Sequence, residues 1–301
     1  MHDLLDPKND FVFKRIFGSE ENKDVLLAFL NRTFLEAGEP PLTEIVLMNP
    51  YTDKDSPRDK QSIFDIQART VEGKLINVEM QLFNKYDNEK RTLYYWSKQY
   101  SSQLGKGQPY SRLQKCVTIN ILNFSILPNE RYHSVFHLRE DHSGIPLIDD
   151  IEVHIMELSK LEQQSIPSEG GLLNWLLFLK SEDTTNWEVL KMNEPQLGKA
   201  MTALEYLSQS AEARRLYEMR QKALHDEVSM LEGAREEGER KGREQGIELG
   251  REQGREQGRE QGLYEKSAEI ARKMLAKGNE IDEIVELSGL TAEEIERLKA
   301  H

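Results

Sequence analysis

Residues 63–81 read IFDIQARTVEGKLINVEMQ, and this stretch decides the fold. Polar and apolar residues alternate from residue 75 to 83, as they do in a strand that covers a core with one face. Glu79 and Gln81 therefore point to the same side of the sheet. A three-residue loop ending at Gly73 would join this strand to the one before it, because glycine accepts the left-handed backbone that such loops need. The stretch predicts a β-hairpin.

The hairpin register brings two carboxylates together. Asp65 would lie directly opposite Glu79, with Cβ atoms about 5 Å apart. Carboxylates at that distance repel unless a cation lies between them or one keeps its proton. Oxygen ligands of this kind suit Mg²⁺ or Mn²⁺ better than zinc, which suggests a metal that activates water for attack on a phosphodiester. The alternative is a hairpin with an ordinary solvated face, on which acids need no function.

The flanking sequence adds further stretches in a fixed order. They are Asn9–Phe17, Leu26–Asn31, the strand of Asp65, Val78–Gln81, Arg91–Tyr100, Gln103–Tyr110 and Val117–Leu122. As an ordered set across residues 8–124, they resemble the PD-(D/E)XK nuclease superfamily, and within it the Rpn family of recombination-promoting nucleases, also described as transposases. The resemblance implies an α/β fold with a mixed αβ restriction-endonuclease-like core, here followed by an all-helical C-terminal extension.

In that superfamily an Asp and the acid of an acid-x-Lys motif bind the metal, and the Lys orients or polarises the attacking water. The resemblance places these catalytic roles on Asp65, Glu79 and Gln81, with Mg²⁺ as cofactor and Mn²⁺ as its substitute. Gln81 departs from the superfamily pattern but resembles the form usual in the Rpn group. A neutral amide supplies no positive charge, so the transition state would depend more on the metal and on Arg or Lys elsewhere. The backbone carbonyl of Met80 is a further candidate metal ligand.

The formal net charge of −13 argues against a nucleic-acid ligand, because phosphate contacts need Lys and Arg. The distribution of charge matters more, since residues 85–115 carry a net charge of +5. Aromatic residues interleave with these charges, so the stretch could hold a nucleic-acid backbone and stack on bases. Equally, aromatic side chains at helical spacing face a core while Lys lies on the solvated side. The candidate nucleic-acid contacts are Lys14, Lys85, Arg91, Lys98 and Lys106.

A chain of 301 residues is long enough for about two domains. We expect four segments: a nuclease-like core over 1–160, a helical extension packing on the core over 161–210, a Gly-Arg-Glu-Gln repeat over 211–262 that is helical or flexible, and a small helical module over 263–301. Within the core we expect helices over 19–37 and 88–104, and strands over 116–124, 132–138 and 151–158.

The only cysteine, Cys116, precedes an apolar run and is expected to be a buried strand residue rather than a nucleophile. The first residues lack the basic and apolar regions of a signal peptide. The most apolar stretch, 171–179, is too short to span a bilayer. We therefore expect a cytoplasmic protein without membrane contact, and a buried helix over 171–179.

His133 and His137 alternate onto one face of an expected strand, and His142 follows in the next loop. Such spacing can hold a metal. We favour ordinary strand and loop residues, because the local sequence offers no cysteine or further acid to complete a ligand set.

The tail repeats the unit Arg-Glu-Gln-Gly. Its glycines are Gly233, Gly238, Gly242, Gly246, Gly250, Gly254, Gly258 and Gly262. Interior glycine disfavours a helix by roughly 1 kcal/mol relative to alanine, whereas Glu and Arg three residues apart can pair along one. The plain interpretation is a solvated, partly helical spacer, and the alternative is a self-association element in which glycines allow helices to approach closely.

Residues 281–298 form two short amphipathic helices around a Gly stop and a Thr cap, a pattern that resembles a helix-turn-helix. The second helix, 291–299, is rich in acid and would repel phosphate. We therefore favour protein packing over DNA contact for this pair.

Together these features predict a metal-dependent DNA endonuclease, associated with recombination, transposition or defence against mobile elements. Its chemistry would lie within residues 1 to about 210, and its partner would be DNA. The C-terminal tail would set a homodimer or higher homo-oligomer. The alternative from another class is a nucleic-acid-binding or assembly protein that keeps the nuclease fold and in which Gln81 marks lost activity.

Overall fold

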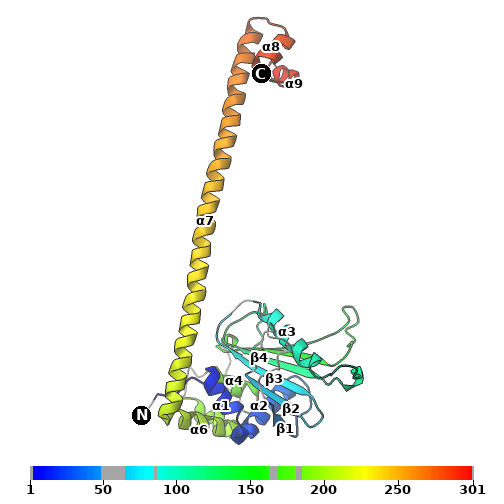
Figure 1. Cartoon of the computed structure of the whole chain (residues 1–301), viewed down its shortest axis with the longest axis vertical. Helices are drawn as coiled ribbons and strands as arrows, with labels where there is room; N and C mark the ends of the chain where they lie inside the picture. The colour runs from blue at the N-terminus through cyan, green and yellow to red at the C-terminus, as the bar shows by residue number, and fades with distance from the viewer. Residues whose placement is uncertain (1–2, 49–64, 85–86, 163–168, 181–184, 300–301) are drawn as a thin grey trace. The chain divides into compact units, whose positions relative to one another are not determined.

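The computed structural model describes residues 3–48, 65–84, 87–162, 169–180 and 185–299. These residues form a mixed sheet with helices on both faces, followed by a helical C-terminal region (Figure 1). The strands are β1 (Ile45–Leu47), β2 (Ile66–Thr70), β3 (Leu75–Gln81), β4 (Cys116–Leu122), β5 (His133–His137) and β6 (Ile151–Glu157). The predicted fold class is confirmed.

The helices of the N-terminal part precede the strands, separate β3 from β4, and follow β6. They are α1 (Asp10–Phe17), α2 (Lys23–Glu36), α3 (Asn88–Ser101), α4 (Leu172–Lys180), α5 (Trp187–Asn193) and α6 (Pro195–Gln209), with 3₁₀ turns at η1 (Glu20–Asn22), η2 (Tyr110–Arg112) and η3 (Leu158–Leu161). The strands run in the order β1-β2-β3-β4-β6-β5. The β3–β4 and β4–β6 pairs are parallel, and the other pairs are antiparallel.

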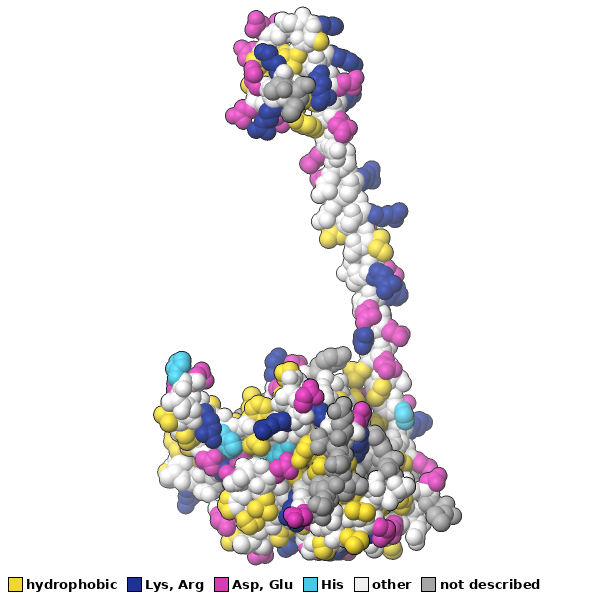
Figure 2. All heavy atoms as spheres, turned by 180° about the vertical axis from the view of Figure 1, so that it is seen from behind, with side chains coloured by type: hydrophobic (Ala, Val, Ile, Leu, Met, Phe, Trp, Pro, Cys, Tyr) yellow, Lys and Arg dark blue, Asp and Glu magenta, His cyan; other side chains and the backbone are white. Residues whose placement is uncertain are grey.

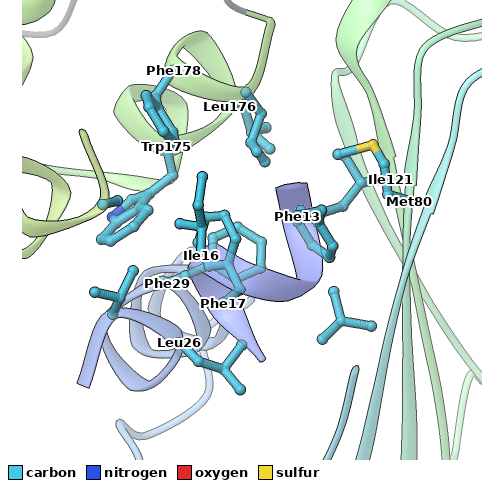
Figure 3. Packing of buried hydrophobic residues seen from close by; sticks show 14 of the residues in the cluster. Phe13, Ile16, Phe17, Leu26, Phe29, Met80, Ile121, Trp175, Leu176 and Phe178 are labelled. Carbon is cyan, nitrogen blue, oxygen red and sulfur yellow. The ribbon is translucent and has the colours of Figure 1, made fainter. Parts of the chain in front are cut away.

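The main core lies on one face of the sheet, between the strands and helices α1, α2, α4, α5 and α6. Phe13 and Phe17 of α1 pack with Phe29 of α2 and Trp175 of α4, beside Met80 of β3 (Figure 3). Even-numbered residues of β3 face this core, so its odd-numbered residues face α3 on the other side (Figure 1). The expected buried helix over 171–179 is therefore confirmed as α4, and α4 closes the core.

The hairpin forms in the register that the sequence predicts. The N–H of Thr70 donates to the carbonyl of Lys74 at 2.9 Å, and Gly73 has a φ of +95°. Ile66 pairs with Val78, so one further step along the ladder sets Asp65 opposite Glu79. Because glycine alone adopts this φ without strain, Gly73 fixes the loop length and with it the register.

Other local predictions differ from the structure mainly at element ends. The helix expected over 19–37 begins as the 3₁₀ turn η1 before α2, and the helix expected over 88–104 ends at Ser101. Cys116 is fully buried in β4 as predicted, and burial raises the pKa of its thiol to about 12. The eight-residue helix α1 and the three-residue edge strand β1 were not predicted.

The structure divides into two units, Met1–Leu224 and His225–His301. A single helix, α7 (Ala211–Ala276), runs through the boundary, and its residue Tyr217 packs against the core of the first unit. The second unit ends in α8 (Ile281–Ser288) and α9 (Ala292–Lys299), which share a small core with the last turns of α7. None of the helices in the described ranges is both long and apolar enough to cross a membrane.

The glycine repeat is helical throughout and exposed. Charged side chains line α7 on the face shown in Figure 2, with few hydrophobic ones among them. Ion pairs between residues four apart stabilise the helix, such as Arg235 with Glu239 at 2.9 Å and Arg240 with Glu244 at 2.8 Å. A Cβ atom added at any glycine of the repeat would meet no other atom within 4 Å.

We predict that replacing Gly246, Gly250 and Gly254 together by alanine stabilises the second unit. Alanine fits without contact and favours helix by roughly 1 kcal/mol per site, so the helical circular dichroism signal should persist to higher temperature. Gly73→Ala is the control and should lower the thermal stability, because Gly73 has a φ of +95° and an added Cβ atom would lie 3.3 Å from Gln114. If light scattering instead shows that the triple variant forms smaller assemblies than wild type, the glycines pack between helices of different copies of the chain.

Candidate active site

Asp65 lies immediately before β2, where its carboxylate reaches the edge of β3. Its Oδ2 atom accepts a hydrogen bond from the backbone N–H of Met80 at 2.8 Å. Its Oδ1 atom lies 3.2 Å from the Nζ atom of Lys14, which comes from α1 on the core face of the sheet. Burial raises the pKa of the Asp65 carboxyl, while Lys14 and the Met80 N–H act in the opposite direction.

Glu79 lies on the face of β3 that α3 covers and is only 5% exposed. Its Oε2 atom lies 3.3 Å from an Nη atom of Arg91 in α3, and its Oε1 atom accepts a hydrogen bond from Asn77 at 3.2 Å. Burial raises the pKa of the Glu79 carboxyl, Arg91 lowers it, and the nearby negative charge of Asp65 raises it further. The two carboxylates therefore interact, as the register predicts.

The face that carries Glu79 is not the solvated face of an ordinary hairpin. Asn77 and Gln81 are buried beside Glu79, because β4 continues the sheet and α3 covers it. The contact layer is polar: Thr92 of α3 donates a hydrogen bond to Asn120 of β4 at 3.2 Å. The alternative of a wet hairpin face is thus wrong for these described residues.

Gln81 is 8% exposed, and its Oε1 atom has no hydrogen-bond partner among the described residues. The Oδ1 atom of Asn77 is in the same condition. Buried oxygens without a donor are costly, so each of them is a position where a water or another bound group would be stabilised.

The backbone of Met80 presents both its polar groups toward β2. In an antiparallel ladder the N–H and C=O of one residue point the same way, and the Met80 N–H points to Asp65. The carbonyl is therefore directed to the same edge as the Asp65 carboxylate. This direction is compatible with the role of Met80 as a third ligand.

The donor atoms at this edge fit a hard divalent cation. Two carboxylates and one carbonyl are oxygen ligands of the kind that Mg²⁺ and Mn²⁺ prefer. Burial raises the pKa values of Asp65 and Glu79 although Lys14 and Arg91 lie beside them, so further positive charge would stabilise the ionised carboxylates. When bound, such a cation would lower the pKa of a coordinated water and stabilise charge on a phosphate.

The predicted nucleic-acid contacts do not all gather at this site. Lys14 and Arg91 reach the two carboxylates from opposite faces of the sheet. Lys98 lies seven residues after Arg91, on the same side of α3. Lys106 lies in the exposed loop between α3 and η2, and Lys85 falls outside the described residues.

The aromatic residues of α3 are shared between its two sides. Trp96 stacks on Tyr100 with ring centroids 4.9 Å apart and donates a hydrogen bond to the carbonyl of Cys116, so both pack toward the sheet. Tyr94 is exposed. The aromatic residues of α3 are thus divided between the sheet and the solvent, and a contact of the exposed side with nucleic acid stays a prediction.

The histidine cluster has the acids that the local sequence lacks. Ligand atoms of Glu39, His137 and Glu152 all lie within 4.8 Å of one another, and His133 contacts His154 at 2.9 Å. The expectation that no acid lies beside these histidines was therefore wrong. The local sequence could not show the acids, because they come from distant parts of the chain.

A lysine lies at the centre of that cluster. The Nζ atom of Lys115 is 2.5 Å from Glu152, 2.8 Å from Asp149 and 3.7 Å from Glu39. Burial acts to raise the pKa of Glu152, but His154 and Lys115 outweigh it and hold the value at about 2. Because an ammonium already neutralises the acids, we interpret the cluster as a structural ion-pair network.

Sequence analysis missed Asp10 as a neighbour of the site. Its negative charge raises the pKa of Asp65, and its own carboxylate lies 3.8 Å from Arg220 at the start of α7. The signal was present, because Asp10 stands four residues before Lys14 on the same side of a helix.

Comparisons with known proteins agree with this geometry. Residues 7–234 match the model of the PD-(D/E)XK nuclease family transposase, and residues 264–300 match the C-terminal HTH domain of the Rpn/YhgA-like nuclease family. Searches of curated proteins and of solved structures gave no match.

A mixed sheet with one acid on β3 and another immediately before β2, together with a match over most of the chain, defines a nuclease of the PD-(D/E)XK type. The chain belongs to the PD-(D/E)XK nuclease family transposases, in the Rpn/YhgA-like group. The predicted resemblance is confirmed, as is the helix-turn-helix pattern at the C-terminus.

We predict that Glu79→Gln stabilises the metal-free protein at neutral pH. The pKa of Glu79 is raised in the folded protein, so the protonated side chain stabilises the folded state fully at pH values below the ordinary pKa of glutamic acid. This stabilisation is lost as the pH rises through the raised pKa. The melting temperature of the variant relative to wild type should therefore increase with pH, by about 2–4 °C for each kcal/mol.

The measurement is thermal unfolding in a chelator between pH 4 and 8. Glu72→Gln is the control, since Glu72 is exposed in the same hairpin and its pKa is lowered. A Glu79→Gln variant that is less stable than wild type at neutral pH would contradict the electrostatic assignment.

Proposed function

We propose that the chain is a metal-dependent DNA endonuclease that hydrolyses phosphodiester bonds. Asp65, Glu79 and the Met80 carbonyl would hold Mg²⁺, or Mn²⁺ in its place, and Gln81 would position a water or a phosphate oxygen. The observation that carries this proposal is the pair of interacting carboxylates formed by Asp65, immediately before β2, and Glu79, which is buried on β3. The match to a nuclease family supports it.

DNA as the substrate is supported by the positive side chains around the acids. Lys14, Arg91 and Lys98 would contact phosphates, with Lys85 and Lys106 further along the strand of DNA. The helix-turn-helix match also fits DNA. Because the first turn of α9 carries Glu293 and Glu294, we assign the DNA contacts to the core.

The biological setting that we propose is recombination, transposition or defence against mobile elements, in the cytoplasm. The family description, which names a transposase, supports transposition. The competing proposal is a binding or assembly protein that keeps the nuclease fold without cutting. Gln81 favours that alternative, because it replaces the lysine of the superfamily motif.

We predict that the protein nicks or cuts DNA with Mg²⁺ or Mn²⁺, and that Asp65→Ala and Glu79→Ala each abolish cleavage. Loss of a metal ligand removes the bound cation, so the rate should fall by at least roughly a hundredfold. The assay is relaxation and linearisation of supercoiled plasmid, with Glu72→Ala as the matched control in the same hairpin.

Circular dichroism of each variant confirms that it is folded. Cleavage that survives both substitutions, or that continues in excess chelator, would refute the assignment of these ligands. A folded wild-type protein that binds DNA but never cuts it would favour the binding protein instead.

We further propose that the C-terminal helices set a homo-oligomer. Charged, exposed α7 residues bury little apolar area, and a long isolated helix gains most of its stability from packing. The cleavage chemistry would remain in the first unit. Its boundary for a truncated protein is best set after Leu224, because Tyr217 packs on the core and Arg214 hydrogen-bonds the Ser208 carbonyl at 2.6 Å.

We predict that a protein ending at Leu224 keeps metal-dependent cutting of short duplexes and loses the higher mass of the full chain. Light scattering and the duplex assay measure the two properties separately. Equal monomeric masses would refute the assembly role. A folded but inactive truncated protein would show that the tail, or the oligomer it forms, is needed for catalysis.

A further inference from the structure

We propose that Lys14 supplies at the reaction centre the positive charge that Gln81 cannot. This inference rests on the proposed function and names the side chain that replaces the missing motif lysine. In this role the ammonium of Lys14 contacts a non-bridging oxygen of the scissile phosphate while Asp65 holds it in place.

The position of Lys14 is set by the core of the protein. Helix α1 begins at an Asn9 cap, whose side chain accepts the N–H of Phe11 at 3.1 Å. Phe13 and Ile16, on either side of Lys14 in the sequence, are fully buried. With its backbone fixed in this way, Lys14 extends to Asp65 and leaves its Nζ atom 3.2 Å from Oδ1. A fixed helix is a better support for such a charge than a loop.

The side chain of Lys14 is also accessible. The exposed fraction of the side chain alone is 33% for Lys14, against 7% for the side chain of Glu79, so Lys14 lies at the solvent side of the acid pair. An ammonium has three N–H donors, and the Asp65 contact needs only one of them. The others can turn to a phosphate oxygen that arrives from solvent.

Arg91 is the other cation beside the acids, and it fits this role less well. Its guanidinium is held by Glu79 on one side and lies over the ring of Tyr95, 5.7 Å from the centroid. Both contacts hold the guanidinium beside Glu79, the more deeply buried of the two carboxylates. Arg91 therefore serves to orient Glu79, whereas Lys14 has donors to offer to substrate.

Two consequences separate this role from general DNA affinity. A charge that acts on the reacting phosphate changes the rate with DNA saturating, while an ordinary phosphate contact changes only the DNA dissociation constant. Lys14 also competes with a divalent cation for Asp65. Removing it should therefore strengthen Mn²⁺ binding even as cleavage falls.

The experiment compares full-length wild type with Lys14→Gln, Lys14→Arg, Arg15→Gln, Gln81→Lys and the double variant Lys14→Gln/Gln81→Lys. Arg15 is the matched control, because it carries the same charge on the next residue of α1 and is exposed. Three quantities are measured: the single-turnover rate on a short duplex at saturating DNA and Mn²⁺, the duplex dissociation constant in Ca²⁺, and Mn²⁺ affinity without DNA by electron paramagnetic resonance.

We expect Lys14→Gln to lower the single-turnover rate by roughly a hundredfold, with little change in duplex affinity. Mn²⁺ should bind this variant several-fold more tightly than it binds wild type. Lys14→Arg should keep part of the rate, and Arg15→Gln should behave as wild type. In the double variant, Gln81→Lys should raise the single-turnover rate at least roughly tenfold above that of Lys14→Gln, because it returns a cation to the reaction centre.

If Lys14→Gln and Arg15→Gln both cut at the wild-type rate, the proposed role of Lys14 is overturned and the nuclease proposal stands. The same holds if Gln81→Lys gives no rescue while the double variant is folded and binds Mn²⁺. If wild type itself cuts no duplex with Mn²⁺, the proposed function fails, and the role of Lys14 fails with it.

Discussion

The register of the β2–β3 hairpin is the constraint on which the site depends. Strand side chains alternate in direction, so a slip of one residue would turn Glu79 and Gln81 into the apolar core and bring Met80 out. Gly73 prevents this slip, because its positive φ closes a loop of one length only. The pairing of Ile66 with Val78 then carries the register to the end of β2, where Asp65 meets β3.

The electrostatics of the site follow from that register. Two carboxylates are brought together in a partly dry place, and helices on opposite faces of the sheet each contribute one cation to them. The compensation is incomplete, since the pKa values of both acids remain raised. Ionisation of these acids therefore opposes folding, which is usual where function and stability compete.

The sequence was sufficient for the features that depend on local pattern. Alternation from residue 75 to 83 and a single glycine specify the hairpin, and with it the position of Asp65 across from Glu79. The family resemblance rested on this same stretch together with its flanks. Helix ends were less accurate, because capping and 3₁₀ turns shift them by a few residues.

What the sequence could not show depends on contacts between distant segments. The Lys14–Asp65 pair joins residues that no local pattern links, and the acids around His137 come from after α2 and from β6. The packing of α3 was predictable only in part: the spacing of its aromatic residues indicated a side that faces a core, but its fully buried residues are polar and gave no signal for the cover over the acids. The metal ligands and DNA contacts are proposals, because they involve groups from several distant segments.

That polar layer has a thermodynamic consequence for α3. The residues that α3 buries completely are the polar Asn88, Thr92 and Gln99, while the rings of Trp96 and Tyr100 pack toward the sheet and are half-buried. Heat capacity rises on opening in proportion to the apolar surface that meets water. Separation of α3 from the sheet would wet amides and a hydroxyl together with parts of two rings. Its heat-capacity change should therefore be smaller than that for opening an apolar helix such as α4, and its free energy should depend less on temperature.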